Sequence, residues 1–97
     1  MSIYKGPQPL GAILKEVIQS LGIQQKLDEA RIIEAWAELA GPQINGVTDS
    51  AWVKDTTLFV KITSSVWRQE LHMQRGAWCN RLNAHLGAKL VTEIVFR

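Results

Sequence analysis

Aromatic and basic side chains alternate in two short segments in the second half of the chain. Trp52 precedes Lys54, and Phe59 precedes Lys61, each at a spacing of two residues. On a strand, residues at this spacing lie on one face. Aromatic rings beside cations suit single-stranded nucleic acid, because bases stack on the rings while lysines neutralise phosphates. Two alternatives remain open: the rings only cover a sheet as a cross-strand pair, or a homodimer buries them.

A second basic surface is predicted on a helix over residues 64–87. At about 100° per residue, four of its side chains fall on one strip, namely Arg68, His72, Arg75 and Cys79. Such a strip can follow a phosphate backbone, although the solvated side of an amphipathic helix explains it equally well. We interpret His72 and Cys79 as unrelated residues rather than a reactive pair. The chain has no glycine-rich phosphate loop, metal-ligand cluster or nucleophile motif. We therefore expect that the protein is not an enzyme and that it binds neither a cofactor nor a metal ion.

Length and charge limit the possible functions further. A chain of 97 residues predicts one domain. Residues 1–46 hold four basic and five acidic side chains, whereas residues 47–97 hold seven and four. A polyanion would therefore be attracted to the second half. No apolar run reaches the ~20 residues that span a bilayer, and the opening residues do not form a secretory signal. We expect a cytoplasmic protein without a membrane partner.

Hydrophobic periodicity predicts six elements in the order helix, helix, strand, strand, helix, strand. They are expected at residues 9–21, 28–40, 47–54, 57–63, 64–87 and 90–97. Gly22, Gly41 and Gly87 are predicted to end the three helices in turn. Asp28 is expected to cap the second helix, with Leu27 and Ile32 as a hydrophobic staple. In the third helix, Gly76 marks either a close packing contact or a bend.

Three strands cannot enclose a core alone, so the helices must cover one face of the sheet. The predicted fold class is α+β, with an open second face. A turn at Asp55 and Thr56 places Trp52 opposite Phe59 on that open face. The last strand is expected to direct one set of side chains to the core and another to the open face, respectively Leu90, Ile94 and Phe96, and Val91, Val95 and Arg97.

The junction between the second strand and the third helix has a distinct composition. Ser64 and Ser65 are both good N-cap residues, and Trp67 and Leu71 are predicted to lock the helix against the sheet. Glu70 is expected to bond backward toward the turn. A further apolar stripe on this helix is assigned either to the core or to a partner groove; it comprises Val66, Met73, Ala77 and Ala84.

Several of these residues together resemble the bacterial DciA-like family. The matching positions are Trp36, Gly41, Leu58, Val60, Ser64, Ser65, Trp67, Glu70, Leu71, Leu82, Asn83 and Gly87. The resemblance implies a single domain over residues 9–97 after a short extension at residues 1–8. It also implies a K-homology-like fold with the order α-α-β-β-α-β, and a role in loading or operating the replicative DNA helicase. The implied partners are the helicase hexamer and single-stranded or duplex DNA.

The family pattern is not matched throughout. Many members carry a basic tail beyond the domain, whereas this sequence stops at Arg97, so we expect weak DNA binding or binding that depends on the helicase. The Gly-x-x-Gly clamp of K-homology domains is absent, and the single Cys79 excludes a zinc ribbon. The alternative function is a protein-interaction or homodimerisation module that binds no nucleic acid. The proposed binding residues are Trp52, Lys54, Phe59, Lys61, Arg68, Arg75 and Arg97.

Overall fold

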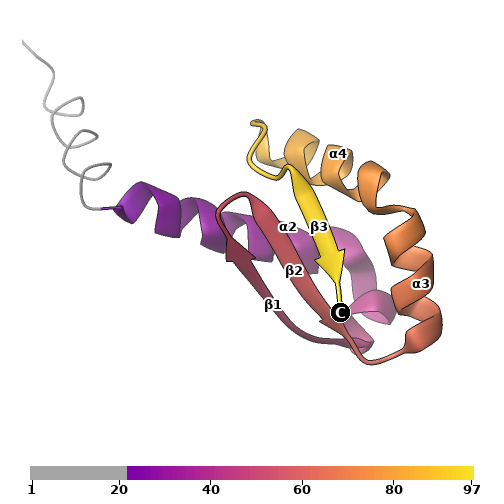
Figure 1. Ribbon diagram of the computed structural model, residues 1–97. Coiled ribbons are helices and arrows are strands. Elements are labelled where there is room, and N and C mark those ends of the chain that lie inside the picture. Colours follow the sequence, from indigo (N-terminus) through magenta and orange to yellow (C-terminus); the bar gives the residue numbers. More distant parts are fainter. Residues whose placement is uncertain (1–21) are drawn as a thin grey trace, which may run out of the picture.

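The computed structural model describes residues 22–97, which form an α+β fold (Figure 1). The expected extension at residues 1–8 and helix at residues 9–21 lie outside this part of the chain. The elements, in order, are α2 (Ile23–Gly46), β1 (Thr48–Lys54), β2 (Thr57–Ile62), α3 (Ser65–Met73), α4 (Arg75–Leu86) and β3 (Glu93–Phe96). The predicted fold class is therefore confirmed, with the third predicted helix divided into two.

The sheet has the strand order β1-β2-β3. β1 and β2 are antiparallel, and the predicted register is confirmed because Trp52 pairs with Phe59 and Val53 with Leu58. β2 and β3 are parallel, with Phe59 paired to Val95. A parallel pair needs a long crossover connection, and α3 and α4 supply it.

The core lies between one face of the sheet and the helices. Alternate residues of β2 and β3 are buried there: Leu58, Val60, Ile62, Ile94 and Phe96. The indole of Trp36 on α2 packs against Trp78 of α4 and against Phe96, at centroid distances of 4.8 and 5.6 Å. Figure 1 shows α2 behind the three strands. The residues that alternate with the buried ones on β2 and β3 point to the opposite face, which no helix among residues 22–97 covers. We call it the helix-free face.

α2 differs from the predicted second helix at both ends. It starts at Ile23 rather than Asp28, and Asp28 accepts a hydrogen bond from Gln24 inside the helix. The predicted Asp28 cap was therefore wrong. Gly41 interrupts the helix with φ 81° and ψ 173°, but helical structure resumes at Pro42 and continues to Gly46. Proline has no N–H and a fixed φ that suits a first helical position, so Gly41 and Pro42 produce a kink instead of an end.

The long predicted helix is broken at Gln74 into α3 and α4. The N–H of Gln74 bonds to the carbonyl of Leu71, a tighter turn than an α-helix makes. A Cβ at Gly76 would meet nothing within 4 Å, so the close-contact alternative for this glycine was wrong and a bend occurs two residues earlier. Ser64 caps α3 by accepting a hydrogen bond from the Trp67 N–H at 3.3 Å. Gly87 ends α4 with φ 73°.

The last strand begins later than predicted. β3 starts at Glu93, and Val91, which was expected on the open face, is buried in the core at 1% exposure. The side chain of Asn83 explains why Val91 is buried. Its Oδ1 accepts hydrogen bonds from the N–H groups of Leu90 and Val91, and its Nδ2 donates to the Val91 carbonyl, all at 2.9–3.0 Å. These bonds hold residues 90–91 against α4 in a conformation that is not a strand.

Candidate nucleic-acid and partner interface

The helix-free face of the sheet carries two stacked aromatic rings with a guanidinium group over one of them. The rings of Trp52 and Phe59 are nearly parallel, with an interplanar angle of 2° and a centroid distance of 5.5 Å. The guanidinium carbon of Arg97 lies 5.0 Å from the Phe59 centroid. Trp52 lies on β1 and Arg97 directly follows β3, on the two sides of β2, so Phe59 lies between them. We call Trp52, Phe59 and Arg97 the aromatic ladder.

The two rings of the ladder differ in what they can bind. Phe59 is half-buried and has a neighbour on each side, whereas Trp52 is 38% exposed and lies on a strand at the edge of the sheet. Trp52 is therefore the ring of the ladder that is more open to a further planar group.

The cations on this face are partly balanced by carboxylates. Lys54, Lys61 and Arg97 are exposed. The Lys61 Nζ lies 3.9 Å from a carboxylate oxygen of Asp49, and both side chains are more than half exposed. Glu93 lies on the same face, in the row of Lys54. Exposed ion pairs at this distance contribute little to stability, so their main effect is to reduce the positive potential of the face.

The predicted strip of basic residues on the long helix is not continuous. Arg68 is half-buried, and its guanidinium donates a hydrogen bond of 2.7 Å to the carbonyl of Ile62 at the end of β2. Arg75, beyond the break at Gln74, donates to the carbonyl of His72 at 2.8 Å. Arg68 therefore ties α3 to the sheet. Arg75 is exposed and bonds to one carbonyl group near the end of α3, that of His72.

The residues that match the family pattern are mostly structural. Trp36, Leu71 and Leu82 are buried, and Trp67 is half-buried against the core. Glu70 accepts a hydrogen bond from Gln74 at 3.3 Å instead of bonding back to the turn.

The predicted apolar stripe begins on α3, where Val66 and Met73 are 77% and 70% exposed. Ala77 and Ala84, the two members of the predicted apolar stripe on α4, are exposed as well. The stripe therefore lies outside the core, which removes one of its two assignments.

Cys79 and His72 do not form a reactive site. The Cys79 thiol packs against the core, where burial, and secondarily the negative charge of Glu93, raise its pKa above the ordinary cysteine value. A raised pKa disfavours the thiolate, which is the reactive form.

Nowhere between residues 22 and 97 do three or more His, Cys, Asp or Glu side chains gather in a way that could hold a metal ion. Over the same residues, no helix has both the length and the apolar character of a membrane span.

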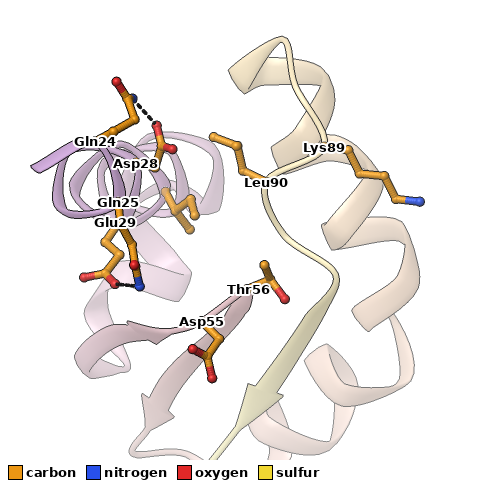
Figure 2. Close-up of a pocket in the computed structure, with 9 residues that line it drawn as sticks. Gln24, Gln25, Asp28, Glu29, Asp55, Thr56, Lys89 and Leu90 are labelled. Atoms are coloured by element: carbon orange, nitrogen blue, oxygen red, sulfur yellow. Dashed lines mark hydrogen bonds between the residues drawn. The ribbon is translucent and has the colours of Figure 1, made fainter. Parts of the chain in front are cut away.

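A groove of about 480 Å³ was not predicted from the sequence. Its walls are the first turns of α2, the β1–β2 turn at residues 55–56 and the loop at residues 89–90. Figure 2 shows the carboxylates of Asp28, Glu29 and Asp55 around it, and Leu90 directed toward α2. Because the lining residues come from three distant segments, no sequence pattern connects them. Its acidic rim makes it unsuitable for a polyanion.

These features define a small α+β domain with an aromatic and basic sheet face and an acidic helix side. A family model described as "Dna[CI] antecedent, DciA" matches residues 9–96, so the chain belongs to that family. Membership indicates a bacterial role related to DNA replication.

Curated relatives agree with this assignment. UPF0232 proteins of Rhodococcus jostii and of Mycolicibacterium smegmatis are 23% and 26% identical to the chain over 90 residues. A UPF0232 protein of Mycolicibacterium paratuberculosis is 24% identical over the same length. In each comparison 93% of the chain is aligned, against 48%, 46% and 50% of the respective relative. The chain thus spans about half the length of these relatives.

Proposed function

We propose that this protein is a DNA-replication accessory domain that binds the replicative helicase and, weakly, DNA. The family assignment supports the connection with replication. The observation that carries the DNA-binding part is the aromatic ladder beside Lys54 and Lys61, on a sheet face that no helix among residues 22–97 covers. Aromatic platforms with adjacent cations bind single strands in many proteins because every base has a face that can stack.

The composition of the face supports weak binding. One base stacked on Trp52 contributes about 1–3 kcal/mol. Three cations allow at most three phosphate contacts. For three contacts with a single strand, a plot of log affinity against log salt concentration has a slope of about −2. Such a slope corresponds to about a sixteenfold loss of affinity between 50 and 200 mM salt. Asp49 and Glu93 reduce the electrostatic contribution further.

The DNA-binding part is tested by titrating the protein with a fluorescein-labelled single-stranded oligonucleotide at several salt concentrations, and with the matching duplex. Trp52→Ala should weaken single-strand binding by about tenfold, as the loss of one stacked base predicts. Arg81→Gln is the matched control, because Arg81 also lies over an aromatic ring, 4.2 Å from the centroid of Trp78, but on α4. If the wild type binds no DNA at low salt, or if Trp52→Ala binds as well as the wild type, this part of the proposal is wrong.

The helicase part needs a separate measurement. The host's replicative helicase should be retained by the immobilised wild-type protein, and retention should be compared for Trp52→Ala and for Arg68→Ala/Arg75→Ala. Because Arg68 bonds to the end of β2, circular dichroism must first show that the double variant is folded. Absence of any retention contradicts helicase binding. Self-association that persists at high salt and disappears in Trp52→Ala would instead favour the homodimerisation module.

A further inference from the structure

The backbone of Arg97 is fixed on both sides by the strand that carries Phe59. Its N–H bonds to the Val60 carbonyl at 2.8 Å, and its carbonyl accepts from the Ile62 N–H at 2.6 Å. The side chain therefore starts from a rigid point next to β2. Its guanidinium then lies over the Phe59 ring, at 5.0 Å from the centroid. A planar guanidinium stacks on an aromatic face in a way that the ammonium group of lysine does not reproduce.

A cation in this position is attracted to the face of the ring that it covers. Phe59 is in turn parallel to Trp52 within 2°. Side chains packed in this order restrict each other, and a ring that is already ordered loses less conformational freedom when a ligand stacks on it. Lys54 and Lys61, by contrast, are exposed on the same face, and the Lys61 ammonium lies 3.9 Å from a carboxylate oxygen of Asp49.

We infer that Arg97 is a positioning residue for Trp52, acting through Phe59, and that the ladder accepts one unstacked base on the side of the Trp52 ring that faces away from Phe59. This inference rests on the proposed DNA binding and deepens it, because it assigns different tasks to the three cations. Lys54 and Lys61 contact phosphates, and Arg97 does not. The salt slope on single strands is then about −1.4 for two phosphate contacts instead of about −2 for three.

Two conservative substitutions separate the two roles of Arg97. Arg97→Lys keeps the charge but loses the planar group, and Arg97→Gln keeps a planar amide but loses the charge. If Arg97 positions Trp52, both variants weaken single-strand binding by about threefold to tenfold and leave the salt slope unchanged. If Arg97 contacts a phosphate, Arg97→Lys binds like the wild type and Arg97→Gln flattens the slope by about 0.7. The second pattern would overturn the inference.

Fluorine NMR of the free protein tests the positioning without DNA. The chain has four tryptophans, so labelling with 5-fluorotryptophan allows four resonances, and Trp52→Phe identifies that of Trp52. Arg97→Lys should shift the Trp52 resonance, and this effect should vanish in a Phe59→Leu background because the coupling passes through Phe59. Arg81→Lys, which alters the matched stack on Trp78, should leave the Trp52 resonance in place.

The outcomes distinguish the inference from the proposed function. A wild type that binds no DNA overturns the proposed DNA binding together with the base site, while the fluorine spectra still decide whether Arg97 positions Trp52. A wild type that binds DNA with a slope near −1.4, and whose Trp52 resonance responds to Arg97 only when Phe59 is present, supports the inference. An unchanged Trp52 resonance in Arg97→Lys contradicts it even if DNA binds. Equal affinity for the single strand and the matching duplex contradicts the unstacked-base site.

Discussion

Replacing Asn83 by alanine should destabilise the domain, because one side chain holds the segment before β3 against α4. Asn83 makes three hydrogen bonds from α4 to residues 90–91, each 2.9–3.0 Å long. A typical intramolecular hydrogen bond contributes about 1 kcal/mol net. The Leu90 N–H has a second acceptor, the carbonyl of Ala88 at 3.0 Å, so it does not lose its only partner. The expected loss in the free energy of unfolding is therefore about 2–3 kcal/mol.

Thermal and urea denaturation, followed by far-ultraviolet circular dichroism, measure this loss. For a domain of this size, about 2–3 kcal/mol lowers Tm by about 10–20 °C. Asn83→Asp is the matched control, because its carboxylate keeps both acceptor sites but cannot donate to the Val91 carbonyl. It should cost roughly half as much as Asn83→Ala. The urea m value should be unchanged, since the same surface is exposed on unfolding.

Two results would refute the reasoning about Asn83. A loss below about 0.5 kcal/mol for Asn83→Ala would mean that water replaces the three bonds at no cost. A loss below about 0.5 kcal/mol for Asn83→Asp would mean that the bond to the Val91 carbonyl contributes nothing. In the first case, the burial of Val91 would need another cause.

Further predictions concern glycines and the thiol. Gly41→Ala should lower the free energy of unfolding by about 1–3 kcal/mol, because φ 81° and ψ 173° belong to a region open essentially only to glycine. Gly76→Ala should raise the free energy of unfolding by about 0.5–1 kcal/mol, since this glycine is helical and nothing lies within 4 Å of an added Cβ. Urea denaturation measures both changes. If both variants were stabilised or both destabilised, the argument from backbone conformation would be contradicted. Cys79 should react with iodoacetamide at pH 8 more slowly than a free cysteine, because burial and then Glu93 raise its pKa and reduce the thiolate fraction. Glu93→Gln should lower that pKa toward the ordinary value and speed the reaction, and an unchanged rate would exclude the contribution of Glu93.

Local sequence patterns were enough to predict the hairpin, the cap at Ser64 and the end of α4 at Gly87. The strict alternation around Asp55 and Thr56 fixes which side chains of β1 and β2 share a face, so the pairing of Trp52 with Phe59 followed from sequence alone. The cap at Ser64 and the glycine end at Gly87 followed from the backbone preferences of these residues.

Features that depend on distant segments could not be predicted in the same way. The burial of Val91 depends on Asn83, which lies eight residues earlier and on a helix. The contact of Arg97 with Phe59 depends on the parallel pairing of β2 with β3, and hence on the crossover through α3 and α4. Arg68 has the sequence context of a solvated helix residue, but the end of β2 offers it the Ile62 carbonyl. Periodicity describes single elements and contains no information about which carbonyl or ring a neighbouring element supplies.

The late position of β3 in the chain has a consequence during protein synthesis. β2 receives its parallel neighbour only from residues 93–96, and Phe96 completes the packing around Trp36 near the other end of the described chain. A ribosome that has translated only as far as α4 therefore holds a nascent chain whose hairpin can form but whose central strand still has one unpaired edge and an incomplete core. Folding of this domain must wait until β3 has emerged, and until then the apolar side chains of Leu58, Val60 and Ile62 are incompletely covered, which favours aggregation.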